Sequence, residues 1–191
     1  MRRWAGLKAL ISELIAGEIA RALGLLVPEI VFVELDPELA RTEPDPEIQD
    51  LIKASAGLNL ALDYLPGSVT FDPIAQKIDA DIAASIVWFD AYVTNIDRTA
   101  RNANMLIWHR RLWLIDHGAA FYFHHALKNY LERNRDSFPA IKDYILLPFA
   151  SDLQAVDLNM TQRLTPEIII SSQFFFIILA AIFPGLLLYS A

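Results

Sequence analysis

The chain has 191 residues, of which 54% are hydrophobic, and it carries a formal net charge of −7. This length can bury a core, as one domain or as two small lobes. The acidic balance argues against an extended nucleic acid as partner, and the lack of cysteine excludes a disulfide framework and a thiolate metal site. The composition fits a cytoplasmic protein that binds no nucleic acid.

The first predicted element is an amphipathic helix from Leu7 to Leu25, where apolar residues recur with helical spacing. Gly24 predicts its end, and Pro28 supports that boundary. Glu13 and Glu18 interrupt the apolar stretch, so we expect no signal peptide. Small residues on the flank of the helix would let another element approach Glu13 closely: Ala16, Gly17 and Ala20.

Strands and helices alternate after this helix. Residues 29–35 and 58–65 have the composition of strands, and the second ends at Pro66-Gly67. A short helix over 46–56 is predicted between them, after an acidic loop that is rich in proline. A further helix is predicted over 81–95, with an apolar face formed by Ile82, Ile86, Phe89 and Val93.

A β-hairpin is predicted next, from strands over 105–108 and 112–115 that are joined tightly at His109-Arg110. This turn lacks the favoured Asn-Gly pair. A mostly helical stretch follows, and the chain ends in the apolar segment 174–191. The length of that segment lies at the lower limit for a membrane span, and Pro184-Gly185 would break a helix within it. A membrane anchor, a buried core segment and a foreign end remain open, and we favour the foreign end.

Asp97, Asn102 and Asp116 form the pattern that carries chemistry. Asp97 and Asn102 lie five residues apart in a loop between a helix and the hairpin, and Asp116 follows the hairpin. A hairpin brings its two ends together, so Asn102 and Asp116 are expected at one edge. Their oxygen atoms suit Mg²⁺, and Asp97 could accept a proton from a substrate hydroxyl. The order and spacing match the catalytic loop and the metal-binding Asp of protein kinases.

Two stretches, "NIDRTARNANML" and "LWLIDHGAAFYFHH", resemble the HipA-like kinase family, whose known members are bacterial serine/threonine kinases. "SELIAGEIARALGLLVPE" is similar to the regulatory helix of that family, and "LDYLPGS" stands where the hinge would run. The likeness covers about residues 7–165. It implies an α+β, two-lobed kinase-like fold, with a partial small lobe over 1–67, a mainly helical lobe over 68–170 and an apolar tail over 171–191.

The resemblance also implies a role for each site residue. Asp97 would be the catalytic base, and Asn102 and Asp116 would hold Mg²⁺. Glu13 would occupy the salt-bridge position of the regulatory helix, and the backbone near Tyr64 and Leu65 would bind the adenine of ATP. The implied reaction transfers the γ-phosphoryl group of ATP to a serine or threonine hydroxyl of a protein substrate.

Two departures from the family pattern predict an impaired enzyme. The Lys that should pair with Glu13 belongs on a strand before this helix, yet just twelve residues precede Glu13. Lys8 lies within the helix and is poorly placed to replace it. The phosphate-covering loop is missing for the same reason. At the other end, the apolar tail replaces the helical finish that is expected after Thr165-Pro166. The alternative from another class is a non-catalytic remnant that binds a nucleotide or a partner protein.

Other polar residues leave further alternatives. His117, His124 and His125 could form a transition-metal site of a metallohydrolase, although their spacing matches no usual ligand pattern. Arg98 could neutralise phosphate or pair with a carboxylate such as Asp90.

Overall fold

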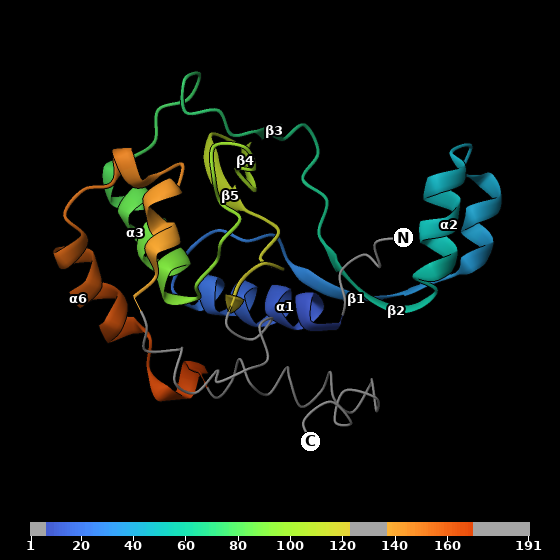
Figure 1. Ribbon diagram of the computed structural model, residues 1–191, viewed down its shortest axis with the longest axis horizontal. Helices are drawn as coiled ribbons and strands as arrows, with labels where there is room; N and C mark the ends of the chain where they lie inside the picture. The colour runs from blue at the N-terminus through green and yellow to red at the C-terminus, as the bar shows by residue number, and fades with distance from the viewer. Residues whose placement is uncertain (1–6, 123–136, 170–191) are drawn as a thin grey trace.

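The computed structural model describes residues 7–122 and 137–169, which fold into a mixed α and β structure with small sheets (Figure 1). No helix within these residues is long and apolar enough to cross a membrane. The apolar segment 174–191 lies outside the described residues, as do residues 123–136 of the stretch predicted to be mostly helical.

Helix α1 (Leu7–Ala22) covers most of the predicted range but is not strongly amphipathic, because buried residues lie on more than one face. Ile11, Leu14 and Ile19 of the apolar stripe are buried. The small flank also packs closely, because a Cβ atom on Gly17 would lie 2.6 Å from Ile30 Cδ1. The helix ends at the predicted glycine: Gly24 has a φ of 86°, and the amide of the next residue donates to the carbonyl of Ala20 over 2.9 Å.

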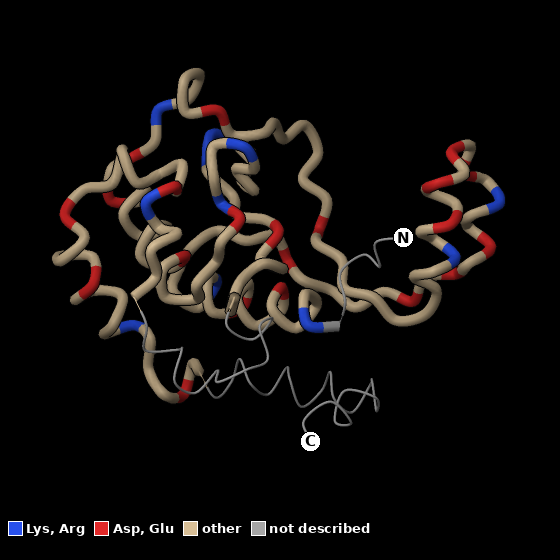
Figure 2. The backbone as a smooth tube through the Cα atoms, viewed as in Figure 1, with Lys and Arg blue, Asp and Glu red and all other residues tan. Residues whose placement is uncertain are grey.

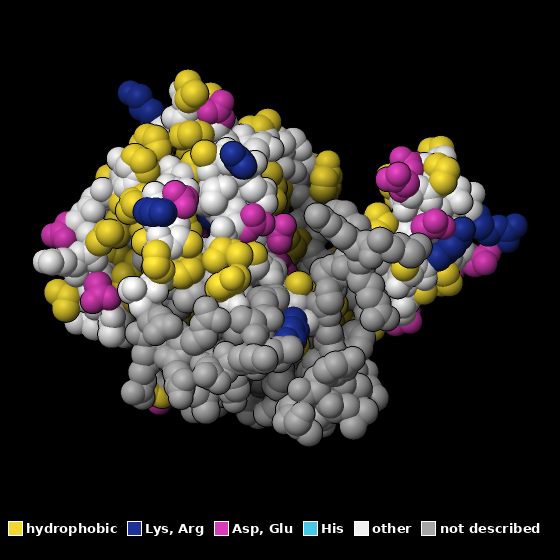
Figure 3. Space-filling view, in the orientation of Figure 1, with side chains coloured by type: hydrophobic (Ala, Val, Ile, Leu, Met, Phe, Trp, Pro, Cys, Tyr) yellow, Lys and Arg dark blue, Asp and Glu magenta, His cyan; other side chains and the backbone are white. Residues whose placement is uncertain are grey.

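Strands β1 (Ile30–Leu35) and β2 (Gly57–Leu62) form an antiparallel ribbon in which Leu35 pairs with Gly57. A 3₁₀ helix, η1 (Pro37–Thr42), and helix α2 (Pro46–Ala54) are carried at the far tip of this ribbon. Asp36 and Asp45 cap these helices, each immediately before the proline that begins the element. None of the α2 residues is buried, and the tip stands off from the rest of the described chain (Figure 3).

The second sheet has the order β3-β4-β5. Strands β4 (Met105–Trp108) and β5 (Arg111–Leu114) form the predicted hairpin, and His109 and Arg110 connect them with φ angles of 48° and 62°. Two consecutive positive φ angles are what a type I′ turn requires. The two-residue strand β3 (Val69–Thr70) pairs with β4. Its pairing was not predicted, because two residues carry no periodic pattern.

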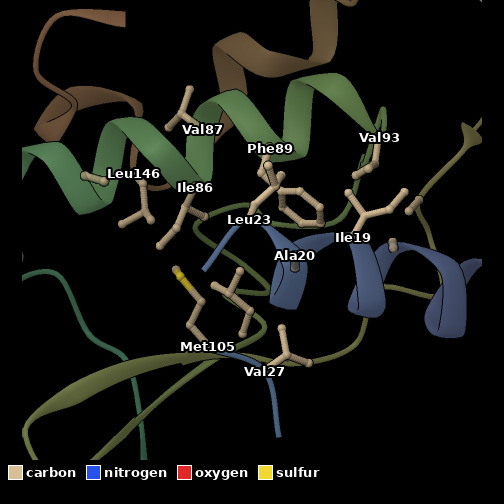
Figure 4. Close-up of a cluster of buried hydrophobic side chains, with 14 of the residues drawn as sticks. Ile19, Ala20, Leu23, Val27, Ile86, Val87, Phe89, Val93, Met105 and Leu146 are labelled. Carbon is tan, nitrogen blue, oxygen red and sulfur yellow. The ribbon is translucent and has the colours of Figure 1, made fainter. Parts of the chain in front are cut away.

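A single buried cluster joins α1, the hairpin and helix α3 (Ala80–Tyr92) (Figure 4). Helix α6 (Leu153–Arg163) and two 3₁₀ helices, η2 (Pro139–Asp143) and η3 (Leu147–Phe149), pack against α3. On the predicted face of α3, Phe89 is fully buried, whereas Ile82 is 48% exposed. Ile82 lies at the start of the helix, where it lines a surface cavity together with Ile86. α3 also ends three residues before the predicted boundary.

Candidate active site

A buried ion pair holds the loop that follows α3. Asp90, on the last turn of α3, receives hydrogen bonds from Arg98 Nε over 2.7 Å and from Asn95 Nδ2 over 3.0 Å. All three side chains are almost completely buried. Of the two alternatives left open by the sequence, Arg98 therefore takes the second and pairs with Asp90.

Arg98 also ties the two ends of the loop together. Its Nη1 donates to the backbone carbonyl of Asn104, where the hairpin begins. Tyr144, from the segment after η2, donates to the Asp90 carbonyl over 3.3 Å. Burial raises the pKa of Asp90 above its ordinary value, and the Arg98 guanidinium opposes that rise. Burial also raises the pKa of Tyr144. These contacts give the loop a fixed shape.

Three hydrogen bonds, each with a different asparagine, hold Asp97 within this loop. Its amide donates to Asn95 Oδ1 over 3.1 Å. Its Oδ2 accepts from Asn102 Nδ2 over 2.8 Å and from Asn104 Nδ2 over 3.5 Å. No described residue donates a hydrogen bond to Asp97 Oδ1, so this oxygen can accept a proton from a bound molecule.

Asp116 follows β5, at the end of the hairpin where the Asp97 loop joins β4. Asn104 connects Asp116 to this loop. Asn104 Nδ2 lies 3.4 Å from the Asp116 carbonyl, and the Asn104 carbonyl accepts from the Ile115 amide over 3.0 Å. Both Asn104 and Asp116 have positive φ angles, of 48° and 53°. Such angles are uncommon for residues other than glycine and gather at functional sites.

The carboxylates around Asp116 repel its negative charge. Its pKa is raised by partial burial first, then by Glu13, and to a smaller degree by Asp97. The amide of Gly118 donates to Asp116 and opposes the rise. The structure therefore places Glu13 and Asp97 close enough to Asp116 to raise its pKa. Asn102 belongs to the same cluster because it donates a hydrogen bond to Asp97.

Glu13 contacts the residue that follows Asp116. Its Oε2 accepts from the His117 amide over 2.5 Å, and its Oε1 lies 3.3 Å from His117 Nδ1. The His117 side chain is fully buried and packs edge-on against Phe89. This pair fixes α1 against the end of the hairpin. Both oxygen atoms of the Glu13 carboxylate contact His117.

Asn102 and Asp116 could supply oxygen atoms to a magnesium ion at the end of the hairpin. Asn102 uses its amide nitrogen on Asp97, which leaves its oxygen available, and the Asp116 carboxylate is exposed. Mg²⁺ usually takes one or two protein oxygens together with water and phosphate oxygens. No group of three or more His, Asp or Glu side chains is arranged around a metal position in residues 7–122 and 137–169. His124 and His125 lie outside those ranges.

A cavity of about 440 Å³ opens beside the acidic cluster. Ala9, Leu10 and Glu13 of α1 form one wall, and Asp116 and Tyr122 belong to the other. The cavity borders Asp116 but does not reach Tyr64 or Leu65.

Tyr64 and Leu65 lie apart from the acidic cluster, in the segment between β2 and β3. The Tyr64 side chain is 80% exposed and Leu65 is buried. The carbonyl of Leu65 accepts from Ser68, and the next carbonyl, of Pro66, accepts from Trp108 Nε1 on β4. No described residue hydrogen bonds to the backbone of Tyr64, so this backbone is free to bind another molecule.

Sequence reasoning missed the structural roles of three residues that shape the site. Asn95 and Asn104 position Asp97, and their place within the "NIDRTARNAN" stretch was a signal that could have indicated them. The pairing of His117 with Glu13 spans 104 residues, and no local pattern predicts it.

The family model described as HipA-like kinase matches residues 2–134, which include Glu13, Tyr64, Leu65, Asp97, Asn102 and Asp116. No curated protein and no solved structure matches the chain. The match covers more than half of the 191 residues, and the chain therefore belongs to the HipA-like kinase family.

Proposed function

We propose that this chain binds ATP with Mg²⁺ and is built to transfer the γ-phosphoryl group to a serine or threonine hydroxyl of a protein. The observation that carries the proposal is the convergence of Asp97, Asn102 and Asp116 at one end of the hairpin, with Glu13 of α1 held beside them. Family membership agrees with this chemistry.

Each residue has a defined role in the proposed reaction. Asn102 and Asp116 would hold Mg²⁺, which would neutralise charge on the phosphate oxygens. Asp97 Oδ1 accepts the hydroxyl proton while the hydroxyl oxygen bonds to the γ-phosphorus. The bond from that phosphorus to the bridging oxygen breaks, and ADP leaves. The backbone of Tyr64 and Leu65 binds the adenine, for which the unpaired backbone of Tyr64 is suited.

The proposed fold is a two-lobed kinase fold with an incomplete small lobe. Residues 1–67 would form the partial small lobe, residues 68–170 the mainly helical lobe and residues 171–191 a tail. The segment 62–68 would be the hinge between the lobes. This division is supported by the position of that segment between the two sheets.

We further propose that the 191-residue chain transfers phosphate poorly. Phosphoryl transfer depends on groups that neutralise charge on the phosphates. The Glu13 carboxylate contacts His117, which stands where the kinase arrangement would place a lysine that neutralises phosphate charge. Losing one preorganised donor commonly lowers the rate by two to three powers of ten. A non-catalytic nucleotide-binding remnant is the second candidate, and the same observation favours it.

Thermal unfolding with ligands tests the binding proposal. Mg²⁺ and ATP together should raise the melting temperature more than either alone, because saturation at a hundred times Kd adds about 2.7 kcal/mol to the folded state. Asp116→Ala should abolish the Mg²⁺-dependent part, whereas the exposed control Arg101→Ala should retain it. An unchanged Mg²⁺ response in Asp116→Ala would exclude Asp116 from the site, and a response to Zn²⁺ alone would favour the metallohydrolase.

Phosphoryl transfer from radiolabelled ATP separates the two candidates. A trace of transfer that disappears in Asp97→Ala indicates an impaired kinase, and complete absence with retained binding indicates the remnant. Rapid transfer that depends on Asp97 would show that the proposed impairment is wrong.

A further inference from the structure

A second cavity, of about 340 Å³, lies at the opposite end of the hairpin from Asp116. Its walls come from the end of α1, the start of α3, the hairpin turn and the end of α6. The volume is in the range of small-molecule sites. None of the proposed nucleotide-site residues lines it.

The floor of this cavity is apolar and its rim is cationic. Four buried side chains contribute to the floor: Phe71, Ile86, Leu114 and Met160. Four basic residues from separate segments line the cavity: Lys77, Arg110, Arg111 and Arg163. Figure 2 shows basic residues (blue) at the hairpin turn and in the loop that leads into α3. The whole chain is acidic, so a basic cavity is a departure from its average charge.

No described carboxylate neutralises these cations. Within residues 7–122 and 137–169 none of the four forms an ion pair. Asp79 is the acidic residue among the lining residues, and its Oδ1 accepts from the amides of Asp81 and Ile82 as the cap of α3. Arg163 is already positioned, because its Nη1 donates to the Leu23 carbonyl over 3.0 Å.

We propose that this cavity binds a small organic anion with an apolar body, such as an aromatic carboxylate or an aryl phosphate. The apolar body would cover the floor, and the anionic group would lie among the basic side chains. The positive end of the α3 dipole favours the same charge. This inference is independent of the proposed nucleotide site.

Calorimetric titration of the full chain with three probes of similar shape tests the proposal. 2-Naphthoate and 2-naphthyl phosphate should bind saturably, and neutral 2-naphthamide should bind at least about tenfold more weakly. Tighter binding of 2-naphthoate would indicate that the cavity prefers a carboxylate, and tighter binding of 2-naphthyl phosphate would indicate that it prefers a phosphate. Higher salt should weaken the binding of both.

Charge-neutralising variants locate the site. Lys77→Gln and Arg111→Gln should each weaken 2-naphthoate binding by about five- to tenfold. Arg41→Gln is the matched control, because Arg41 lies on η1 at the ribbon tip, and it should bind as the original chain does. Equal binding of 2-naphthamide, or unchanged binding in both cavity variants, would overturn the proposal.

Discussion

The Asp90–Arg98 pair shows how one buried contact shapes the candidate active site. Neither side chain exceeds 1% exposure, and the Arg98 Nη2 atom is buried with no hydrogen-bond partner among the described residues. A buried ion pair of this kind gives little net stability, but removal of one partner leaves the other charged and unpaired. The main effect of the pair is therefore to fix the conformation of the loop around Asp97.

Arg98→Met should strongly destabilise the chain, by about 3–5 kcal/mol, because Asp90 would stay buried without its cation. Urea unfolding measures the change. Arg101→Met, at an exposed position of the same loop, should have little effect. Adding Asp90→Asn to Arg98→Met should recover part of the loss, and a single variant as stable as the original chain would contradict the assigned contact.

Asp116→Asn should raise the melting temperature at neutral pH, because it removes a charge that Glu13 and Asp97 repel. Because the pKa of Asp116 is raised in the folded state, the direction of the pH dependence can be worked out. The unfavourable charge on Asp116 is fully present above the folded-state pKa and is lost below the ordinary value of about 3.9. The gain should therefore shrink as the pH falls through this window, and it should be small because Asp116 is exposed. Melting curves from pH 3 to 8 measure it, and a gain that grows with acidity would contradict the assignment.

At the scale of elements, local patterns predicted most of the fold. The stripe on α1, the glycine at its end and the two hairpin strands all follow from short-range periodicity and turn residues. The proximity of Asp97 and Asn102 could also be predicted, since these residues lie five apart in one loop. The pairing of β3 and the contact of Glu13 with His117 depend on distant segments, so no local signal could predict them.

The turn between β4 and β5 contains unfavourable residues. His109 and Arg110 both adopt positive φ angles, which cost about 1 kcal/mol or more per ordinary L-residue. His109→Asn combined with Arg110→Gly supplies the residues that a type I′ turn prefers. We expect the free energy of unfolding to increase by about 1 kcal/mol, measured by urea unfolding with an unchanged m-value. A decrease would mean that the turn residues make stabilising contacts that outweigh their backbone strain.

At the scale of the whole molecule, the described chain divides into a core-forming part and a projecting tip. The core joins α1, α3, α6 and the hairpin. η1 and α2 mainly contact each other at the end of the ribbon. The tip should therefore contribute little to the stability of the core.

Replacing residues 36–56 by Asn-Gly tests this division. Leu35 already pairs with Gly57, so a two-residue turn can close β1 directly onto β2. The melting temperature should change by no more than about 4 °C, which corresponds to roughly 1 kcal/mol in a domain of this size. The shortened chain should also keep the response of the full chain to Mg²⁺ and ATP. Loss of cooperative unfolding would show that the tip is part of the folding unit.

The burial of α1 has a consequence for the timescale on which Glu13 can move. The second half of the helix, with Ala16, Ile19 and Ala20, is part of the core. The helix therefore cannot swing away from the hairpin as a rigid rod without opening that core. Amide hydrogens in this half should exchange with solvent as slowly as global unfolding allows, while those of α2 exchange through local opening. The backbone of Glu13 therefore stays beside the end of the hairpin for as long as this core remains folded.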